Sequence, residues 1–307
     1  MSMLRISSRS RCFILSIFCT PLFMIAQKSI DVDSTPLNKL LPTFFSQSFN
    51  ISPITSESDN SIGVCYTGEG KVVFISDRQI LTLPSVNNRY RAFVFDMSSQ
   101  TTKRLDTRNL CDINNNNYNI AGLTVNDSNT FMIVAVNDYR SNEYLAESRI
   151  ILTHVDLSYG FSQCATPPFV QLGYTYTQPF FDSNEDYLYF ASDVDGGMGG
   201  LDIYRVKLLA SNLWGEIEPM TDINTINNDV YPFVDNDGRL YYSTLTGKNG
   251  FDVFCWYENL SRPIRLPSPI NSRLDDLNYV QIGGKDAFIT RTTGDSQSAV
   301  IYRLLAF

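Results

Sequence analysis

The stretch Gln178–Ser192, "QPFFDSNEDYLYFAS", returns about fifty residues later as "YPFVDNDGRLYYST" at Tyr231–Thr244. In both copies an apolar run is followed by an acidic turn and a second apolar run, which is typical of two strands joined by a hairpin. The proline and the aspartate of the two copies match at an offset of 53 residues: Pro179, Asp182, Pro232 and Asp235. Self-similarity at a fixed period predicts a repeated structural unit.

Each copy continues into a glycine-containing turn and a third strand. After the first copy comes "DVDGGMGGLDIYRV" (Asp193–Val206), and after the second comes "LTGKNGFDVF" (Leu245–Phe254). The first of these stretches fails as a calcium loop, because Met198 and Tyr204 stand where that loop needs glycine and glutamate. It also fails as a phosphate loop, because no Gly-Lys-Ser/Thr follows and the next element is a strand.

The stretch is therefore predicted to be a structural turn. We expect Gly196, Gly197, Gly199 and Gly200 to take positive φ angles, and Asp202 to accept hydrogen bonds from backbone amides of the turn. The second copy keeps Gly250 and Asp252 at the matching positions but loses most of the acids. The predicted structural motif of the repeat comprises Pro179, Asp182, Gly199, Gly200, Asp202, Pro232, Asp235, Gly250 and Asp252.

Weaker copies on both sides bring the number of units to five. They begin near Asp59, Asn119 and Asn278, and each reads as three strands with a fourth in the following linker, such as Trp214–Met220. Such a sheet cannot bury both faces alone, so the units are predicted to stack around an axis as a single all-β propeller. Five blades are expected, and six would require a degenerate unit within residues 28–58.

The two ends of the chain carry the remaining domain predictions. Residues 59–307 are assigned to the propeller, and 27–58 to a segment whose part Phe44–Ile54 pairs with the C-terminal strand and removes the exposed edges. Residues 1–26 are predicted to be a signal peptide, because Arg5, Arg9 and Arg11 precede an apolar run that is short for a membrane span. An uncleaved anchor and lipidation at Cys19 are the alternatives.

Export and charge narrow the function classes. Removing residues 1–26 deletes three arginines and no acid, which changes the formal net charge from −8 to −11. Such an acidic chain is a poor ligand for nucleic acid, because the phosphates would repel it. We expect a periplasmic protein with no cofactor. No Cys-x-x-Cys occurs, so a zinc or redox site has no support, and a structural calcium ion is the minor alternative. Cys65 and Cys255 lie in apolar strands and should be buried thiols, whereas Cys111 and Cys164 are the candidate disulfide.

Catalysis is not predicted. The nucleophile motif G-x-S-x-G of α/β-hydrolases is missing, and the single histidine, His154, lies in an expected strand. A glycosidase needs two carboxylates in unlike settings. The acids here recur instead at equivalent repeat positions, which favours roles in turns: Asp77, Asp138, Asp193, Asp229 and Asp276. A carbohydrate-active propeller remains the alternative hypothesis.

The best copies carry further shared residues, namely "LYFAS", "GGMGGLDIY", Trp214-Gly215 and "INT" at Ile223. With the Pro-Asp pairs, they resemble the TolB-like, Pro-Asp type of WD-related propeller repeat that is common in cell-envelope proteins of Bacteroidetes. The resemblance is strong over residues 174–277 and weaker over 59–307. The first, second and fifth units lack the Pro-Asp pair and the Gly-Gly turn, and neither an OmpA-like domain nor helical repeats follow, so peptidoglycan anchoring is not implied.

The expected function is therefore protein binding. A propeller is a rigid disc whose loops vary without disturbing its sheets. Tyrosines suit a binding rim, and the candidates are Tyr139, Tyr144, Tyr174 and Tyr176. The expected partners are envelope or outer-membrane proteins, with no small-molecule ligand. The resemblance further implies a cell-envelope machine such as the type IX secretion or gliding apparatus.

Overall fold

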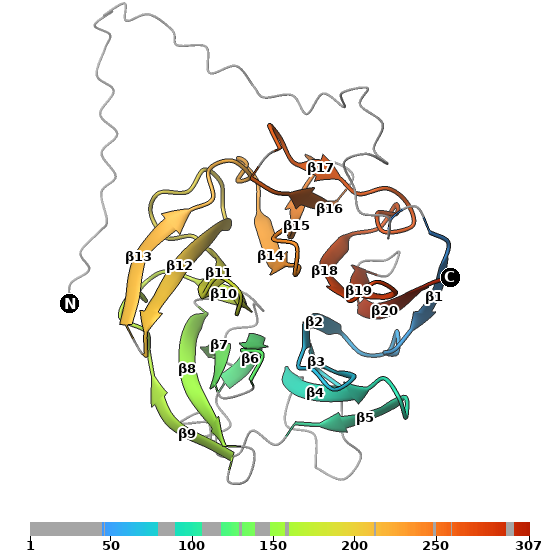
Figure 1. The fold of residues 1–307 in the computed structure, drawn as a ribbon, viewed down its shortest axis with the longest axis horizontal. Coiled ribbons are helices and arrows are strands. Elements are labelled where there is room, and N and C mark those ends of the chain that lie inside the picture. The colour runs from blue at the N-terminus through green and yellow to red at the C-terminus, as the bar shows by residue number, and fades with distance from the viewer. Residues whose placement is uncertain are drawn as a thin grey trace, which may run out of the picture.

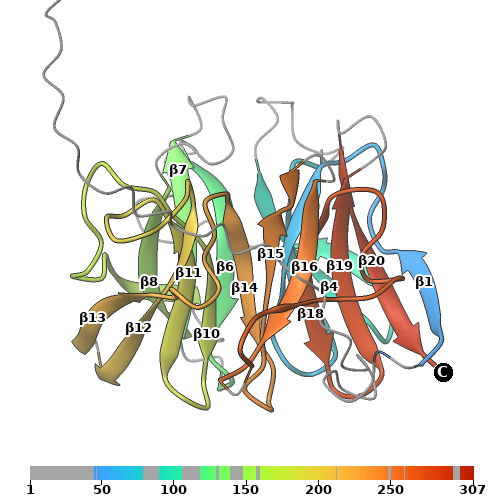
Figure 2. The ribbon, with the colours of Figure 1, turned by 90° about the horizontal axis from the view of Figure 1, so that it is seen from above.

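A computed structural model of the protein describes residues 45, 47–78, 90–105, 118–128, 131–138, 148–156, 160–211, 213–247, 250–258, 260–292 and 298–307. Within these ranges, twenty strands form five four-stranded antiparallel sheets that surround a central axis (Figure 1). Figure 2 shows the resulting disc from its edge. The predicted all-β, five-bladed propeller is thus confirmed, and residues 1–26 lie outside the described part of the chain.

Each blade runs from an inner strand at the axis to an outer strand at the rim. Blade 1 contains β2 (Ser61–Tyr66), β3 (Lys71–Ser76), β4 (Arg91–Asp96) and β5 (Thr101–Arg104). Blade 2 contains β6 (Tyr118–Val125), β7 (Phe131–Asp138), β8 (Arg149–Asp156) and β9 (Gly160–Ala165). Blade 3 contains β10 (Tyr176–Asp182), β11 (Tyr187–Ser192), β12 (Asp202–Ala210) and β13 (Leu213–Pro219). Blade 4 contains β14 (Asp229–Val234), β15 (Leu240–Leu245), β16 (Phe251–Trp256) and β17 (Ile264–Arg265).

Blade 5 is built from both ends of the chain. It contains β18 (Asp276–Ile282), β19 (Asp286–Thr292), β20 (Ala299–Ala306) and, as its outer strand, β1 (Phe49–Pro53). The pairing of β1 with β20 is extended by hydrogen bonds from Ile54 N to Ile301 O (2.8 Å) and from Phe307 N to Ser48 O (3.1 Å). The predicted closure by N- and C-terminal strands is therefore confirmed.

The core lies between neighbouring blades. Because side chains alternate across a strand, each blade buries one row against the blade before it and one against the blade after it. Phe190 and Tyr204 of blade 3 pack with Ile133 of blade 2, for example. Cys65 and Cys255 are buried free thiols, as expected. Cys111 lies outside the described residues, as does the side chain of Cys164, so the proposed disulfide is not described.

The Pro-Asp motif marks the turn from the inner strand to the second strand. Asp235 Oδ1 accepts hydrogen bonds from the amides of Asp237 and Arg239, both at 2.9 Å, and its Oδ2 accepts one from the Tyr241 hydroxyl at 3.0 Å. Asp182 likewise accepts a bond from Asn184 N at 3.0 Å. Both aspartates therefore act as turn residues that satisfy amides released by the end of a strand.

The glycine-rich turn between β11 and β12 differs in part from expectation. Asp202 Oδ2 accepts hydrogen bonds from Met198 N and Gly199 N, both at 2.9 Å, as predicted. Of the four glycines, however, only Gly196 has a positive φ (110°). The expectation for the others is wrong, because they are needed for close approach. A Cβ atom on Gly199 would lie 1.9 Å from the Asn227 carbonyl oxygen, which belongs to the linker crossing this turn.

Candidate functional site

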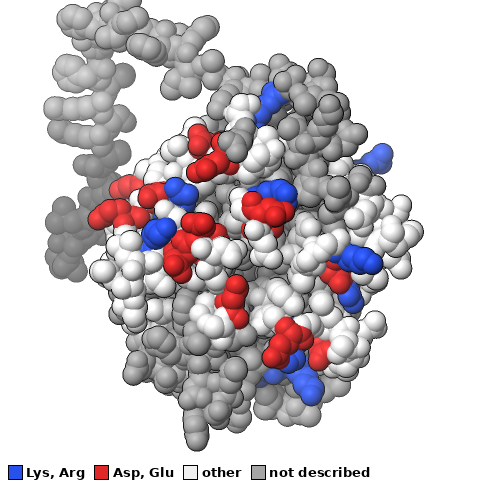
Figure 3. All heavy atoms as spheres, in the orientation of Figure 1, with Lys and Arg blue, Asp and Glu red and all other residues white. Residues whose placement is uncertain are grey.

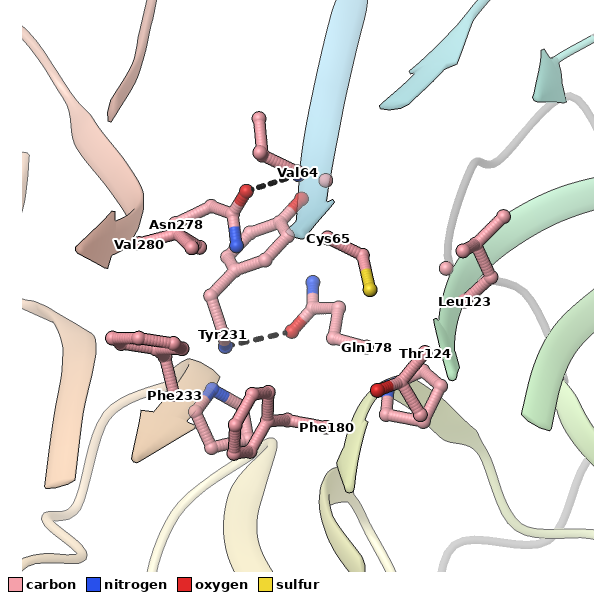
Figure 4. A pocket seen from close by; sticks show the side chains of 14 residues that line it. Val64, Cys65, Leu123, Thr124, Gln178, Phe180, Tyr231, Phe233, Asn278 and Val280 are labelled. Atoms are coloured by element: carbon pink, nitrogen blue, oxygen red, sulfur yellow. Dashed lines mark hydrogen bonds between the residues drawn. The ribbon is translucent and has the colours of Figure 1, made fainter. Parts of the chain in front are cut away.

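The inner strands of all five blades enclose a pocket on the propeller axis (Figure 4). Its empty volume is about 380 Å³, which includes the part that is open to solvent. Its lining residues come from β2, β6, β10, β14 and β18: Gly63, Val64, Cys65, Gly122, Leu123, Thr124, Gln178, Pro179, Phe180, Tyr231, Pro232, Phe233, Asn278 and Val280. A pocket that several elements line together is the default place to look for a bound ligand, so it is the first candidate site.

A β-bulge shapes each inner strand at the pocket. The register with the second strand shifts after Ile62, Ile120, Thr177, Val230 and Leu277. Gln178, Tyr231 and Asn278 have φ angles of 50°, 54° and 50°, which is unusual for residues other than glycine. A bulge takes a backbone amide out of the ladder, so that amide needs another acceptor.

Side chains of the preceding blade supply those acceptors. Gln178 Oε1 accepts a hydrogen bond from Tyr231 N at 3.0 Å, and Asn278 Oδ1 accepts one from Val64 N (Figure 4). Thr124 Oγ1 accepts a bond from Phe181 N at 3.0 Å. These three side-chain oxygens therefore join blade 3 to blade 4, blade 5 to blade 1 and blade 2 to blade 3.

The chemistry of the pocket is apolar and amide-like. Among the described residues that line it, none is Asp, Glu, His, Lys or Arg. Burial raises the pKa of the Cys65 thiol to about 11, so the sulfur stays protonated at neutral pH. The described lining of the pocket offers no acid–base pair.

The acids singled out in the sequence lie elsewhere and hold loops. Asp77 accepts a bond from Asn60 N at 2.7 Å, and Asp193 accepts one from Thr175 N at 2.6 Å. Asp229 accepts one from Thr225 N at 2.6 Å, whereas Asp276 forms an ion pair with Arg291 at 2.6 Å. The side chain of Asp138 is outside the described set. Searched over the described residues, no group of three or more metal-ligating side chains occurs.

Charged side chains on one face of the disc are mixed. In Figure 3, Lys and Arg lie beside Asp and Glu rather than in a separate patch. Among the described residues, ion pairs include Arg205–Glu218 (2.8 Å) and Arg239–Asp237 (2.6 Å). That face therefore shows no field of a single sign that would select a partner by charge.

The predicted tyrosine rim is only partly present. Tyr139 and Tyr144 lie outside the described residues. Tyr174 is half-buried, and its hydroxyl donates to Asp195 Oδ2 at 2.9 Å, which raises its pKa. Tyr176 is 0% exposed and packs against Phe169 and Phe190. The prediction for Tyr176 is wrong as a partner contact, because it begins β10 and points into the core.

Three exposed apolar side chains near Tyr174 were not predicted. Leu172 is 98% exposed, Met198 54% and Ile226 74%. They lie in the loop before β10, in the β11–β12 turn and in the linker from blade 3 to blade 4. We call the segments 166–175, 193–201 and 220–228 together the blade 3 surface. The sequence held one signal for it, since Ile226 stands 47 residues before Arg273, an exposed residue in the next linker.

Comparisons with known proteins support the fold alone. No protein-family model matches the sequence, and no curated protein matches it. Among solved structures, a glycoside hydrolase is 10% identical with a TM-score of 0.53, over 84% of this chain and 90% of that one. A thermostable family-43 glycoside hydrolase is 13% identical with a TM-score of 0.50, over 80% of this chain and 88% of that one.

TolB from Acinetobacter baumannii is also similar. It is 12% identical with a TM-score of 0.45, over 82% of this chain and 56% of the TolB chain. The protein thus spans little more than half the length of that TolB. Each of these likenesses is far below the identity at which function transfers with a shared fold.

Among the described residues, no helix is long and apolar enough to cross a membrane.

Proposed function

We propose that this protein is a non-catalytic, exported β-propeller that binds another protein of the cell envelope. The observation that carries the proposal is the axial pocket, whose described lining is apolar and amide-like and whose Gln178, Asn278 and Thr124 oxygens join neighbouring blades. The acids that could serve catalysis are tied to backbone amides or to arginine. What then varies between the blades is their loops, and variable loops on a rigid scaffold favour recognition.

The competing proposal is a carbohydrate-active propeller, as in the two glycoside hydrolases with the same fold. Glycoside hydrolysis needs two carboxyl groups on either side of the scissile bond, about 5–10 Å apart. The described lining of the axial pocket contributes none. This observation favours binding over hydrolysis.

Several finer statements belong to the same proposal. They are the Pro-Asp repeat type, an origin in the Bacteroidetes envelope, a periplasmic location close to the outer membrane, and a role in the type IX secretion or gliding machinery. All four come from the resemblance of the repeats, and the predicted signal peptide at residues 1–26 supports the export step.

Two measurements test the proposal. Cells producing the protein with a photo-crosslinking residue at single loop positions should yield a discrete adduct, and the adduct partner should bind purified residues 27–307 in calorimetry. The same purified protein should release no sugar from a panel of polysaccharides. Hydrolysis that is lost on changing one aspartate to asparagine, in a protein that still folds, would overturn the proposal.

A further inference from the structure

We propose that the blade 3 surface binds a segment of a second protein that carries both basic and apolar side chains. The inference rests on the proposed function, because it assigns a site and a partner chemistry to a binding module. It is carried by four observations: the continuity of the surface, the way Met198 is held outward, the contrast between Ile226 and Arg273, and the charge of the surface.

The three segments form one continuous surface through hydrogen bonds. The loop before β10 is tied to the β11–β12 turn, because Thr175 N donates to Asp193 Oδ1 at 2.6 Å and the Tyr174 hydroxyl donates to Asp195 Oδ2 at 2.9 Å. The β11–β12 turn is also tied to the linker from blade 3 to blade 4, because Leu201 N donates to Asn228 Oδ1 at 2.9 Å. Leu172, Met198 and Ile226 therefore stand on adjoining loops.

Met198 is presented outward by a closely packed turn. Its amide is held by the buried carboxylate of Asp202 at 2.9 Å. A Cβ atom on Gly197 would lie 2.2 Å from Asp202 Oδ2, and one on Gly199 would lie 1.9 Å from Asn227 O. Because the backbone at Met198 is already held in place, it loses little conformational freedom when a partner binds, which favours affinity.

The fold itself does not require Ile226 to be apolar. The two linkers are built alike, since Thr225 N donates to Asp229 just as Ser272 N donates to Asp276, again 47 residues on. The position after Ser272 is Arg273, which is exposed. Ile226 is 74% exposed at the matching position. A large apolar side chain where the sister linker carries a charge points to a role in contact rather than in packing.

The charge of the surface defines its partner. The segments 166–175, 193–201 and 220–228 contain no Lys or Arg, and Asp193, Asp195 and Asp222 are exposed in them. Some acids outside these segments are paired with arginine, as Glu218 is with Arg205, whereas no ion pair is formed by Asp193, Asp195 or Asp222 with a described residue. Apolar contacts flanked by unneutralised acids complement a segment with Lys or Arg beside Leu, Ile or Phe, and they repel an anionic membrane or a nucleic acid.

The test uses three labelled peptides of equal length and purified residues 27–307. One peptide alternates Lys and Leu, one alternates Glu and Leu, and one alternates Lys and Ser. We expect only the Lys–Leu peptide to bind by fluorescence anisotropy, more weakly as salt rises. Hydrogen exchange should then be slowed at residues 171–175, 193–201 and 224–228.

The decisive variant is Ile226→Arg, because arginine is the residue at the matching position, Arg273, of the linker from blade 4 to blade 5. It should keep the melting temperature and weaken Lys–Leu binding by about tenfold or more, in line with loss of an apolar anchor and addition of a like charge. The matched control is Leu209→Arg, because Leu209 is 59% exposed in the same blade but lies in β12, outside the blade 3 surface. It should change binding by less than about twofold.

Three results would overturn the assignment. The Glu–Leu peptide could bind as tightly as the Lys–Leu peptide, or the two variants could bind the Lys–Leu peptide equally. The unmodified protein could also form a dimer that the Ile226→Arg change dissociates. The last would show that the surface contacts a second copy. If photo-crosslinking finds an envelope partner that Ile226→Arg still binds normally, only this assignment fails. If no loop position yields an adduct, the proposed function fails with it.

Discussion

Asn271 binds both backbone groups of Val253 with one side chain. Its Oδ1 accepts from Val253 N at 2.7 Å, and its Nδ2 donates to Val253 O at 2.9 Å. In the preceding blade Asn224 makes the same two bonds to Ile203, both at 2.9 Å. Each linker asparagine thus continues the ladder of the third strand and fixes the path to the next blade.

Replacing Asn271 by Ala should destabilise the protein more than a change at an exposed asparagine. The change leaves Val253 N–H and Leu266 C=O without their buried partner, and Val253 C=O keeps only its bond from Leu266 N. The expected cost is about 3 kcal/mol in the free energy of unfolding. Urea unfolding of Asn271→Ala measures this loss. The control is Asn236→Ala in an exposed turn, with an expected effect below about 0.5 kcal/mol. Equal effects would contradict the role of Asn271.

Gly199 and Gly284 should respond oppositely to a methyl group. A Cβ on Gly199 would lie 1.9 Å from the Asn227 carbonyl, whereas one on Gly284 would meet nothing within 4 Å. We expect Gly199→Ala to cost about 1–3 kcal/mol, because turn and linker must separate. Gly284→Ala should be neutral or stabilising by up to about 1 kcal/mol, because it restricts the unfolded chain. Thermal unfolding compares the two, and a tolerated Gly199→Ala would show that the linker yields.

Asp229 should make stability depend on pH. It is 0% exposed and one carboxylate oxygen has no hydrogen-bond partner, so burial raises its pKa to about 6. The folded protein therefore holds a proton that the unfolded chain releases near its ordinary pKa. The contribution is fully present below about pH 4 and is lost as the pH rises through about 6, which amounts to at most about 3 kcal/mol.

Asp229→Asn should remove that part of the pH dependence. The amide mimics the protonated acid, so the difference between variant and parent in urea unfolding should grow in favour of the variant from pH 4 to pH 7. Other buried acids titrate in both proteins and cancel in this difference. Parallel curves across that range would mean that Asp229 does not titrate as described.

Removal of β1 should expose the edge of β20 and make the protein aggregate. Deleting residues 27–54 takes away the partner of β20 and exposes its backbone groups at a sheet edge, which invites pairing between molecules. Light scattering after size-exclusion chromatography should show large species. Deleting residues 27–44 keeps every described residue and should leave a monomer. Monomers from both deletions would show that β20 tolerates an open edge.

The repeat offsets predicted the architecture well, because residues at matching positions make equivalent contacts in different blades. Pro179 and Pro232 stand at one position of their blades, and the Asn224–Asn271 offset of 47 marks a shared linker contact. The roles of Gly199 and Gly200 were missed because a linker crosses their turn, and crossing segments leave no local pattern in the sequence. The role of Gly197 was missed because it depends on how closely the Asp202 side chain folds back onto the turn.

The candidate site was less predictable, because its contacts depend on the ends of strands and on how the blades meet. Tyr176 looked like a loop residue, yet it opens β10, where strand alternation turns it inward. The bonds of Gln178 and Asn278 to the next blade exist only once five inner strands meet around the axis. The exposed Ile226 could have been noticed by asking where one linker carries a charge and its sister an apolar residue.

The pairing of β1 with β20 also sets the order of events during synthesis. Blades 1 to 4 are each made of consecutive strands, so each can form its sheet once its own residues have left the ribosome. Blade 5 needs Phe49 beside Ala306, so it is completed only after Ala306 has emerged from the ribosome. β1 is therefore synthesised before all other described strands, and the ring stays an open arc until β20 has emerged.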